Sequence, residues 1–272
     1  MILSSVMPST GVSVANAIQV LESQLQGINN LSGTDAYQRL DAYHTWAAQA
    51  SSQLGYVFDF PTVEQLVHTR RHDFLFTMFG GPQKLLNLTI SAEQEDRVRV
   101  LTGALSELQV LRASTKSLTE TLVVADTNVY LHQDVPFQDL LWHVILDTPT
   151  DLRLFLPMAV MRELDRAKRT PGGKPVSFVS QELVRDRARR TSKFIRTAFS
   201  QTQHAASVSP GVTMEILADP RSHRPIEDPD SEIIDRSLAL QSAAGRSVFV
   251  VTSDGNMQFG AGVAGLDALL LD

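Results

Sequence analysis

Cysteine is absent from the 272 residues of the sequence. This absence excludes disulfide bonds and zinc sites with cysteine ligands, and it suits a reducing compartment such as the cytoplasm. No apolar run reaches the roughly 18 residues that a membrane-spanning helix needs. The N-terminal stretch MILSSVMPSTGVSV also lacks the basic and apolar regions of a secretory signal. We therefore expect a cytoplasmic protein without a membrane segment.

Positive charge in residues 121–272 is concentrated in one segment. The net charge is −6, and 43% of the residues are hydrophobic, which is enough for a folded core. Residues 162–196 contain eleven Lys and Arg against four Asp and Glu, whereas the rest of residues 121–272 contains five basic and fifteen acidic residues. This segregation favours a site that attracts phosphates in one place and cations in another.

The first 115 or so residues are predicted to be helical. Apolar residues recur at steps of three and four over residues 14–28 and again over 36–47. A third helix is predicted to run from Pro61 to the break Gly80-Gly81-Pro82. A fourth is predicted to start at Ser91, because Gln94 completes a capping box there. The polar stretch 113–120 indicates a linker or a short connection.

The pattern changes at Leu122, where short β-branched runs begin to alternate with helical ones. Strands are predicted at 122–126, 152–156, 213–217 and 247–252, and the final LDALLLD can add an edge strand. Helices are predicted at 137–147, 158–169, 178–200, 231–244 and 256–262. Such alternation is typical of an α/β fold with a mainly parallel twisted sheet flanked by helices. We therefore divide the chain into an all-α N-terminal helical domain, residues 1–118, and an α/β domain, residues 119–272.

Four acidic residues stand at the ends of the predicted strands or at the starts of the helices next to them. Asp126 ends the first strand, Asp254 follows the fourth, Glu163 lies in the helix after the second, and Asp230 begins the helix that leads into the fourth. In a parallel sheet all four positions meet at one edge. Clustered carboxylates repel one another, and a divalent cation holds them ionised. An all-oxygen set of this kind suits Mg²⁺ or Mn²⁺.

Each acid also has a simpler structural interpretation. Asp126 and Asp254 are ordinary turn residues after a strand, and Asp254 precedes a glycine. Asp230 can serve as a helix N-cap, and Glu163 can lie on an exposed helix surface. The order and spacing of the four together favour the shared site.

The four segments DTNVYL, VMRELD, DSEIID and TSDGNM, in this order, resemble the PIN domain, a family of metal-dependent nucleases that mostly cleave RNA. The resemblance covers about residues 121–272 and implies that Asp126, Glu163, Asp230 and Asp254 are the catalytic and metal-binding acids. It also implies that Asn128 and Thr252 support them. Many relatives carry a second acid after the third one, where this sequence has Ser231. Asp165 and Asp235 are candidates for an outer layer only.

The basic segment is predicted to bind the RNA backbone. Arg185, Arg189, Lys193 and Arg196 are spaced four, four and three residues apart, so they share one face of a helix. Arg166, Lys168, Arg169 and Lys174 precede this helix around the loop PGGKP, residues 171–175. A track of this kind fits phosphates. The alternative is a solvated helix face with no ligand.

The sequence therefore predicts a cytoplasmic endoribonuclease that uses Mg²⁺ or Mn²⁺, with RNA as its substrate. The N-terminal helices are expected to recruit a protein partner or to form a homodimer. PIN-like domains serve as toxins of toxin–antitoxin pairs and as RNA-processing enzymes, and the additional helical half argues for the second role. Two alternatives remain: a non-catalytic RNA- or protein-binding module on the same fold, and a phosphotransfer domain that uses Asp126 as its nucleophile.

Overall fold

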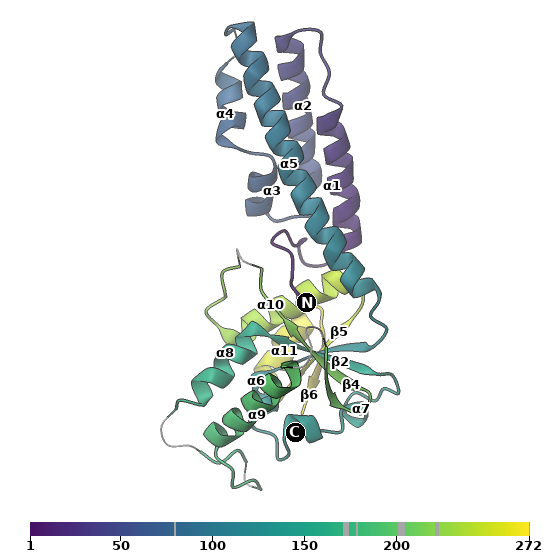
Figure 1. Ribbon diagram of the computed structural model, residues 1–272, viewed down its shortest axis with the longest axis vertical. Helices are drawn as coiled ribbons and strands as arrows, with labels where there is room; N and C mark the ends of the chain where they lie inside the picture. The colour runs from purple at the N-terminus through teal and green to yellow at the C-terminus, as the bar shows by residue number, and fades with distance from the viewer. Residues whose placement is uncertain (79, 171–173, 178, 201–204, 221–222, 272) are drawn as a thin grey trace. The chain divides into compact units, whose positions relative to one another are not determined.

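The computed structural model describes residues 1–78, 80–170, 174–177, 179–200, 205–220 and 223–271 (Figure 1). The chain divides into two compact units, one of Ser4–Lys116 and the other of Met1–Leu3 together with Ser117–Asp272. The first three residues thus differ from the boundaries expected from the sequence. They belong to the second unit because Ile2 forms a parallel bridge with Ala218. In the described parts of the chain, no helix is long and apolar enough to cross a membrane.

The first unit is entirely helical, as predicted. Its helices are α1 (Val14–Asn29), α2 (Ala36–Gly55), α3 (Phe60–Leu66), α4 (Arg70–Thr77) and α5 (Gln83–Lys116). Helices α1, α2 and α4 pack against α5. Their buried faces contain residues such as Leu21, Tyr43 and Leu101, which are fully shielded from solvent. Burying an apolar side chain of this size contributes about 1.5–3 kcal/mol, so packing along α5 dominates the stability of the unit.

Three details of the helical unit differ from the prediction. The predicted third helix is two helices, because Thr69 caps a new start by accepting a hydrogen bond from the His72 N–H. The predicted start at Ser91 is wrong, because α5 begins at Gln83 and Ser91 lies inside it. There the Ser91 hydroxyl accepts a hydrogen bond from Arg39 instead of capping a helix. The predicted linker at 113–120 is also partly wrong, because α5 continues to Lys116.

The second unit contains a six-stranded mixed sheet that is mainly parallel, as predicted. Its strands are β1 (Thr121–Ala125), β2 (Leu152–Pro157), β3 (Ala206–Ser209), β4 (Val212–Leu217), β5 (Val248–Thr252) and β6 (Asp267–Leu270). They lie side by side in the order β3-β4-β2-β1-β5-β6. All neighbours are parallel except β3 and β4. The four main predicted strands and the edge strand in LDALLLD are confirmed.

The helices of this unit surround the sheet (Figure 1). They are α6 (Thr127–Leu131), the 3₁₀ helix η1 (Phe137–Asp139), α7 (Trp142–Ile145), α8 (Met158–Ala167), α9 (Val184–Phe199), α10 (Pro229–Ala244) and α11 (Gly255–Val263). Helix α8 packs against α6, α9 and α10, and α11 packs against β5 and β6. The central strand β1 is buried from Leu122 to Ala125, which explains its continuous apolar sequence.

Two helix predictions in this unit are wrong in extent. Residues 137–147 form only η1 and α7, because Leu140 has an extended backbone between them. Helix α9 begins at Val184 and not at 178, because Pro175 and Leu183 form an antiparallel bridge before it. Part of the predicted PGGKP loop, residues 171–173, lies outside the described residues.

Candidate active site

Asp126 follows β1 directly and is buried at the carboxyl edge of the sheet. Only 1% of its surface is exposed. Its backbone N–H donates to the carbonyl oxygen of Val251 in β5 at 2.9 Å, which continues the pairing of the two strands for one more residue. The buried strand thus carries the carboxylate to a fixed position inside the edge, as its sequence predicted.

The carboxylate of Asp126 receives hydrogen bonds from uncharged donors. Thr252 Oγ1 donates to Asp126 Oδ2 at 2.9 Å, and Asn128 Nδ2 donates to the same oxygen at 3.0 Å. Burial raises the pKa of Asp126, and the nearby charge of Glu163 raises it further. The hydrogen bonds from Thr252 and from the backbone of Thr127 and Asn128 lower the pKa but do not outweigh burial. The site therefore contains an anion whose charge the protein itself compensates only in part.

Glu163 lies beside Asp126, on α8. Its Oε2 accepts a hydrogen bond of 2.5 Å from Thr127 Oγ1, so the first residue of α6 orients this second carboxylate. The sequence prediction did not include Thr127 as a site residue. Its position directly after Asp126 was the signal that could have identified it, because a hydroxyl there lies at the same strand end.

Asp230 occupies the first turn of α10. Burial raises its pKa, and the charges of Asp126, Asp228 and Asp254 act in the same direction. The structure therefore brings Asp230 near two of the other predicted acids. The alternative interpretation of Asp230 as the N-cap is wrong, because Asp228 caps α10 by accepting a hydrogen bond of 3.0 Å from the Ser231 N–H.

Asp254 caps a helix at the same edge of the sheet. It is the N-cap of α11, and its Oδ1 accepts hydrogen bonds from the N–H groups of Asn256 at 2.7 Å and Met257 at 3.4 Å. Its own N–H donates to Thr252 Oγ1 at 3.0 Å. The hydroxyl of Thr252 thus bridges Asp126 and Asp254. Asp254 is thus a turn residue, as its simpler interpretation predicted. Its charge also contributes to the raised pKa of Asp230.

The two outer candidates have partners of their own. Asp165 forms an ion pair with Lys168, and Asp235 forms one with the neighbouring Arg236. Both aspartate side chains are about half exposed, at 54% and 44%. Because Asp165 and Asp235 pair with basic neighbours, we do not count either residue among the proposed metal ligands.

The family model of the PIN domain matches residues 123–271, which is more than half of the chain. The chain belongs to the PIN domain family. PIN domains are generally metal-dependent nucleases, and the matched region contains all four of the acids described above. No curated protein and no solved structure matches the chain.

The four predicted acids of this PIN domain are of the chemical kind that divalent metal ions prefer, but among the described residues no three of them bring ligand atoms within 4.8 Å of one another. Asp126, Glu163, Asp230 and Asp254 offer only carboxylate oxygens, which hard divalent cations such as Mg²⁺ and Mn²⁺ prefer. Burial, and after it the charge of neighbouring carboxylates, raises the pKa of both Asp126 and Asp230. A cation there relieves both the burial cost and the mutual repulsion.

The basic residues that the sequence predicts as RNA contacts lie on α8, on α9 and in the connection after α8. On α9, Arg189, Lys193 and Arg196 are exposed and Arg185 is half-buried. After Glu163 on α8, Arg166 and Arg169 are exposed, and Lys168 pairs with Asp165. Arg169 and Arg196 both lower the pKa of Asp165, after the larger effect of Lys168, so the two groups of cations approach each other there. Arg166, Lys168 and Arg169 thus follow Glu163 within six residues, on α8 or directly after it.

Part of this basic face is already neutralised. Arg189 forms an ion pair of 3.1 Å with Asp186, and Arg185 contacts the same aspartate at 3.5 Å. Another arginine of α9, Arg187, is buried and serves the fold. It pairs with Glu182 at 2.6 Å and donates to the backbone carbonyl of Gln133 at 2.8 Å. Arg187 is two residues away from both Arg185 and Arg189, so it does not share the face of the helix on which the stripe lies.

Proposed function

We propose that this protein is a divalent-metal-dependent endoribonuclease that hydrolyses RNA phosphodiester bonds. The observation that carries the proposal is the burial of Asp126 at the carboxyl edge of the sheet, where its hydrogen-bond donors among the described residues are all uncharged. If Asp126 were only a turn residue, replacing it with an uncharged residue would stabilise the protein. The family match supports the hydrolytic reaction, and the basic face of α9 supports a nucleic-acid substrate.

The residues that would hold Mg²⁺ or Mn²⁺ are Asp126, Glu163, Asp230 and Asp254. When bound, such an ion polarises a phosphate oxygen and makes a coordinated water more acidic. The chain contributes the orientation. Thr252 and Asn128 fix the carboxylate of Asp126, and Thr127 fixes that of Glu163. Because these supports belong to strand ends and helix starts, the acids need little reorganisation when substrate arrives.

The RNA backbone would run along the basic face that adjoins this edge. Its proposed contacts are Arg166, Lys168, Arg169, Arg185, Arg189, Lys193 and Arg196. Lys193, Arg196, Arg166 and Arg169 are the strongest candidates, because Asp186 and Asp165 already pair with the others. Lysine and arginine in this arrangement attract phosphates without reading the base sequence. We therefore expect a substrate held mainly by its backbone.

One observation favours the alternative, a non-catalytic RNA- or protein-binding module. Asp254 uses Oδ1 to cap α11, so only its second oxygen remains for a metal ion. Asp254 nevertheless contributes to the raised pKa of Asp230, after burial, Asp126 and Asp228, which supports including it among the proposed ligands. Four acidic side chains at one edge serve no purpose in binding a polyanion, because they repel it. We therefore prefer the nuclease.

Cleavage of a labelled single-stranded RNA of mixed sequence tests the proposal. The unaltered protein should cleave it in Mn²⁺ or Mg²⁺ and not in excess EDTA. Asp126→Asn should abolish cleavage, whereas Asp267→Asn, a control at an exposed strand position, should not. Full activity of Asp126→Asn, or activity in EDTA, contradicts the nuclease. RNA binding without cleavage in either metal would support the binding module.

A further inference from the structure

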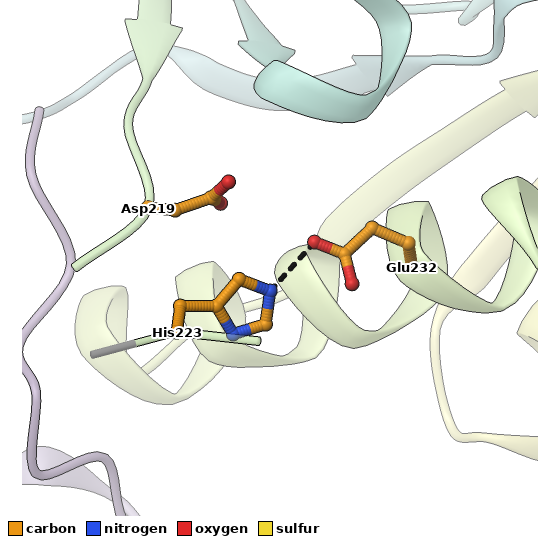
Figure 2. A group of neighbouring side chains, drawn as sticks. All are labelled: Asp219, His223 and Glu232. Carbon is orange, nitrogen blue, oxygen red and sulfur yellow. Dashed lines mark hydrogen bonds and ion pairs between the residues drawn. The ribbon is translucent and has the colours of Figure 1, made fainter. Parts of the chain in front are cut away.

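A second group of potential metal ligands lies in the connection from β4 to α10. Asp219, His223 and Glu232, called here the β4–α10 triad, bring one ligand atom each to within 4.8 Å of one another. Figure 2 shows the two carboxylates and the imidazole ring facing a common space. Among the residues that the structure describes, this is the single group of three such side chains that is so close. Nothing in the proposed RNA cleavage uses these three residues.

Glu232 is the most buried member of the triad, with 1% of its surface exposed. Its Oε2 accepts a hydrogen bond of 2.8 Å from the Ile226 N–H, which holds the carboxylate in one orientation. Its Oε1 lies 2.7 Å from Nε2 of His223, as drawn in Figure 2. The backbone thus fixes one oxygen of Glu232 and leaves the other directed at the space between the three side chains.

Asp219 provides an oxygen that no described residue contacts through a hydrogen bond. Its Oδ1 is inaccessible to solvent and has no hydrogen-bond partner among the described residues. A buried carboxylate oxygen in this condition is unfavourable unless a cation or donor reaches it. The position of Asp219 is set by the backbone, because the neighbouring Ala218 pairs with Met1 and Leu3 through hydrogen bonds of 2.9 and 3.2 Å.

Arg162 compensates the two carboxylates only weakly. Its guanidinium lies 3.5 Å from Asp219 Oδ2 and 3.7 Å from Glu232 Oε1. Both distances exceed the roughly 2.7–2.9 Å of a charge-assisted hydrogen bond. The side chain of Arg162 is also 39% exposed, so it can turn into solvent. Among the described residues, Arg162 and His223 are the side chains that form ion pairs with these two carboxylates.

We propose that the β4–α10 triad binds one Zn²⁺ ion. One imidazole nitrogen and two carboxylate oxygens are ligands that zinc accepts, and a water molecule completes a four-coordinate site. The imidazole distinguishes this site from the four-acid cluster, because nitrogen ligands favour zinc over Mg²⁺. Binding requires Arg162 to move aside and His223 to offer the lone pair of Nε2.

The location gives this site a structural role. Glu232 lies two residues after Asp230 on α10, and Asp219 lies two residues after the end of β4. An ion shared by them ties the first turn of α10 to the sheet and fixes the helix that presents Asp230. The bound zinc would therefore support the acidic cluster without belonging to it.

Calorimetric titration of the chelator-treated full chain with Zn²⁺ tests the site. The unaltered protein should bind one equivalent tightly. His223→Gln and Asp219→Asn should bind it at least about tenfold more weakly, since each removes one of three protein ligands. Two controls should keep the unaltered affinity: His132→Gln, which changes an exposed histidine, and Asp126→Asn, which changes the four-acid cluster. Zinc should also raise the melting temperature of the unaltered protein and of both controls, but not of His223→Gln.

Three outcomes would overturn the proposal. The first is equal zinc affinity in His223→Gln and His132→Gln. The second is loss of the tight equivalent in Asp126→Asn, which assigns zinc to the four-acid cluster. The third is no tight binding to the unaltered protein, which leaves the triad as an ion-pair cluster with Arg162. Asp219→Asn preserves the shape of the side chain, so its zinc affinity tests the site even if His223→Gln fails to fold. RNA cleavage in Mg²⁺ or Mn²⁺ is a separate measurement, so failure here does not affect the proposed nuclease.

Discussion

The hydroxyl of Thr252 donates a hydrogen bond of 2.9 Å to Oδ2 of Asp126, across 126 positions of sequence. The same hydroxyl accepts a hydrogen bond of 3.0 Å from the Asp254 N–H. Thr252 is fully buried at the end of β5. One side chain therefore sets the orientation of Asp126 and the turn that begins α11, so the geometry of two proposed metal ligands depends on it.

Replacing Thr252 with valine should reduce RNA cleavage by about tenfold to a hundredfold. A hydrogen bond to a charged group contributes about 1.5–3 kcal/mol, and each 1.4 kcal/mol corresponds to about tenfold. The Thr252 hydrogen bond lowers the pKa of Asp126, so its loss should also move the acidic limb of the pH–rate profile to higher pH. Both effects are measured by cleavage rates across a pH series in saturating Mn²⁺.

Two variants separate this positioning role from a general loss of packing. Thr252→Ser keeps the hydroxyl and should restore both the rate and the pH profile. Thr213→Val, in which another strand threonine loses a hydroxyl that donates to the Leu152 carbonyl, should leave both unchanged. If Thr252→Val cleaves RNA like the unaltered protein with the same pH profile, Thr252 does not position Asp126 for the reaction.

Asp254 should respond differently to asparagine and to alanine. Asparagine can still cap α11 but carries no charge, so Asp254→Asn should lose most cleavage with little change in unfolding free energy. Asp254→Ala should lose cleavage and also about 1 kcal/mol of stability, because the cap disappears. Urea denaturation gives the stabilities, and the RNA assay gives the rates.

The matched control for Asp254 is Asp35, which caps α2 in the helical unit by accepting hydrogen bonds from Tyr37 and Gln38. Asp35→Asn and Asp35→Ala should change stability in the same way as the Asp254 pair and leave cleavage intact. Undiminished cleavage by Asp254→Asn would show that Asp254 serves only as a cap.

The sequence predicts the acidic edge well because that edge depends on local patterns and simple topology. Short apolar runs such as 122–125 have to be buried strands, and parallel strands bring their carboxyl ends together. Asp126 and Asp254 follow such strands, so their meeting requires only that β1 and β5 belong to one parallel sheet. Glu163 and Asp230 belong to helices at the same edge, and the family resemblance added their roles.

Features that depend on contacts distant in sequence were not predicted. Strand β3 has the unremarkable sequence ASVS and exists because it pairs with β4 across the turn at Gly211, whose φ is +69°. The capping box at Ser91 is a valid local signal, but packing extends α5 through it. The β4–α10 triad has no sequence pattern, because its members meet only when the connection after β4 folds back onto α10.

The raised pKa values of Asp126 and Asp230 should make the metal-free protein less stable as the pH rises from their usual value of 3.8 through the raised ones. Folding raises both pKa values above the usual 3.8, so the folded state binds the extra protons. That contribution to stability is complete below the usual pKa and is lost as the pH rises through the raised values. Other carboxylates, such as Asp96 and Asp228, have lowered pKa values and act in the opposite direction.

The contribution of Asp126 is therefore measured as a difference between two proteins. In EDTA, the unfolding free energy of Asp126→Asn minus that of the unaltered protein should increase with pH, because asparagine has no charge to bury. Mn²⁺ should reduce this difference by stabilising the unaltered protein. A difference that is independent of pH contradicts the raised pKa of Asp126. Asp267→Asn, measured in parallel, should give a difference near zero at every pH.

The basic face should contribute to RNA affinity in a salt-dependent way. Lys193→Gln with Arg196→Gln, both exposed on α9, should weaken binding of single-stranded RNA and lower the slope of log affinity against log salt. Loss of two phosphate contacts predicts a change in slope of about 1.4, since each contact with a single strand contributes about 0.7. Fluorescence anisotropy in the Asp126→Asn background measures binding without cleavage.

The control for this pair is Lys84→Gln with Arg99→Gln, which removes the same charge from exposed positions of α5. This change alters the net charge equally but lies outside the PIN domain, so the slope should stay that of the Asp126→Asn protein. An equal reduction of the slope by both pairs of substitutions would mean that RNA binding depends only on the net charge of the protein. No reduction by either pair would make the stripe on α9 a solvated helix face, and the substrate would then have to be held elsewhere on the PIN domain.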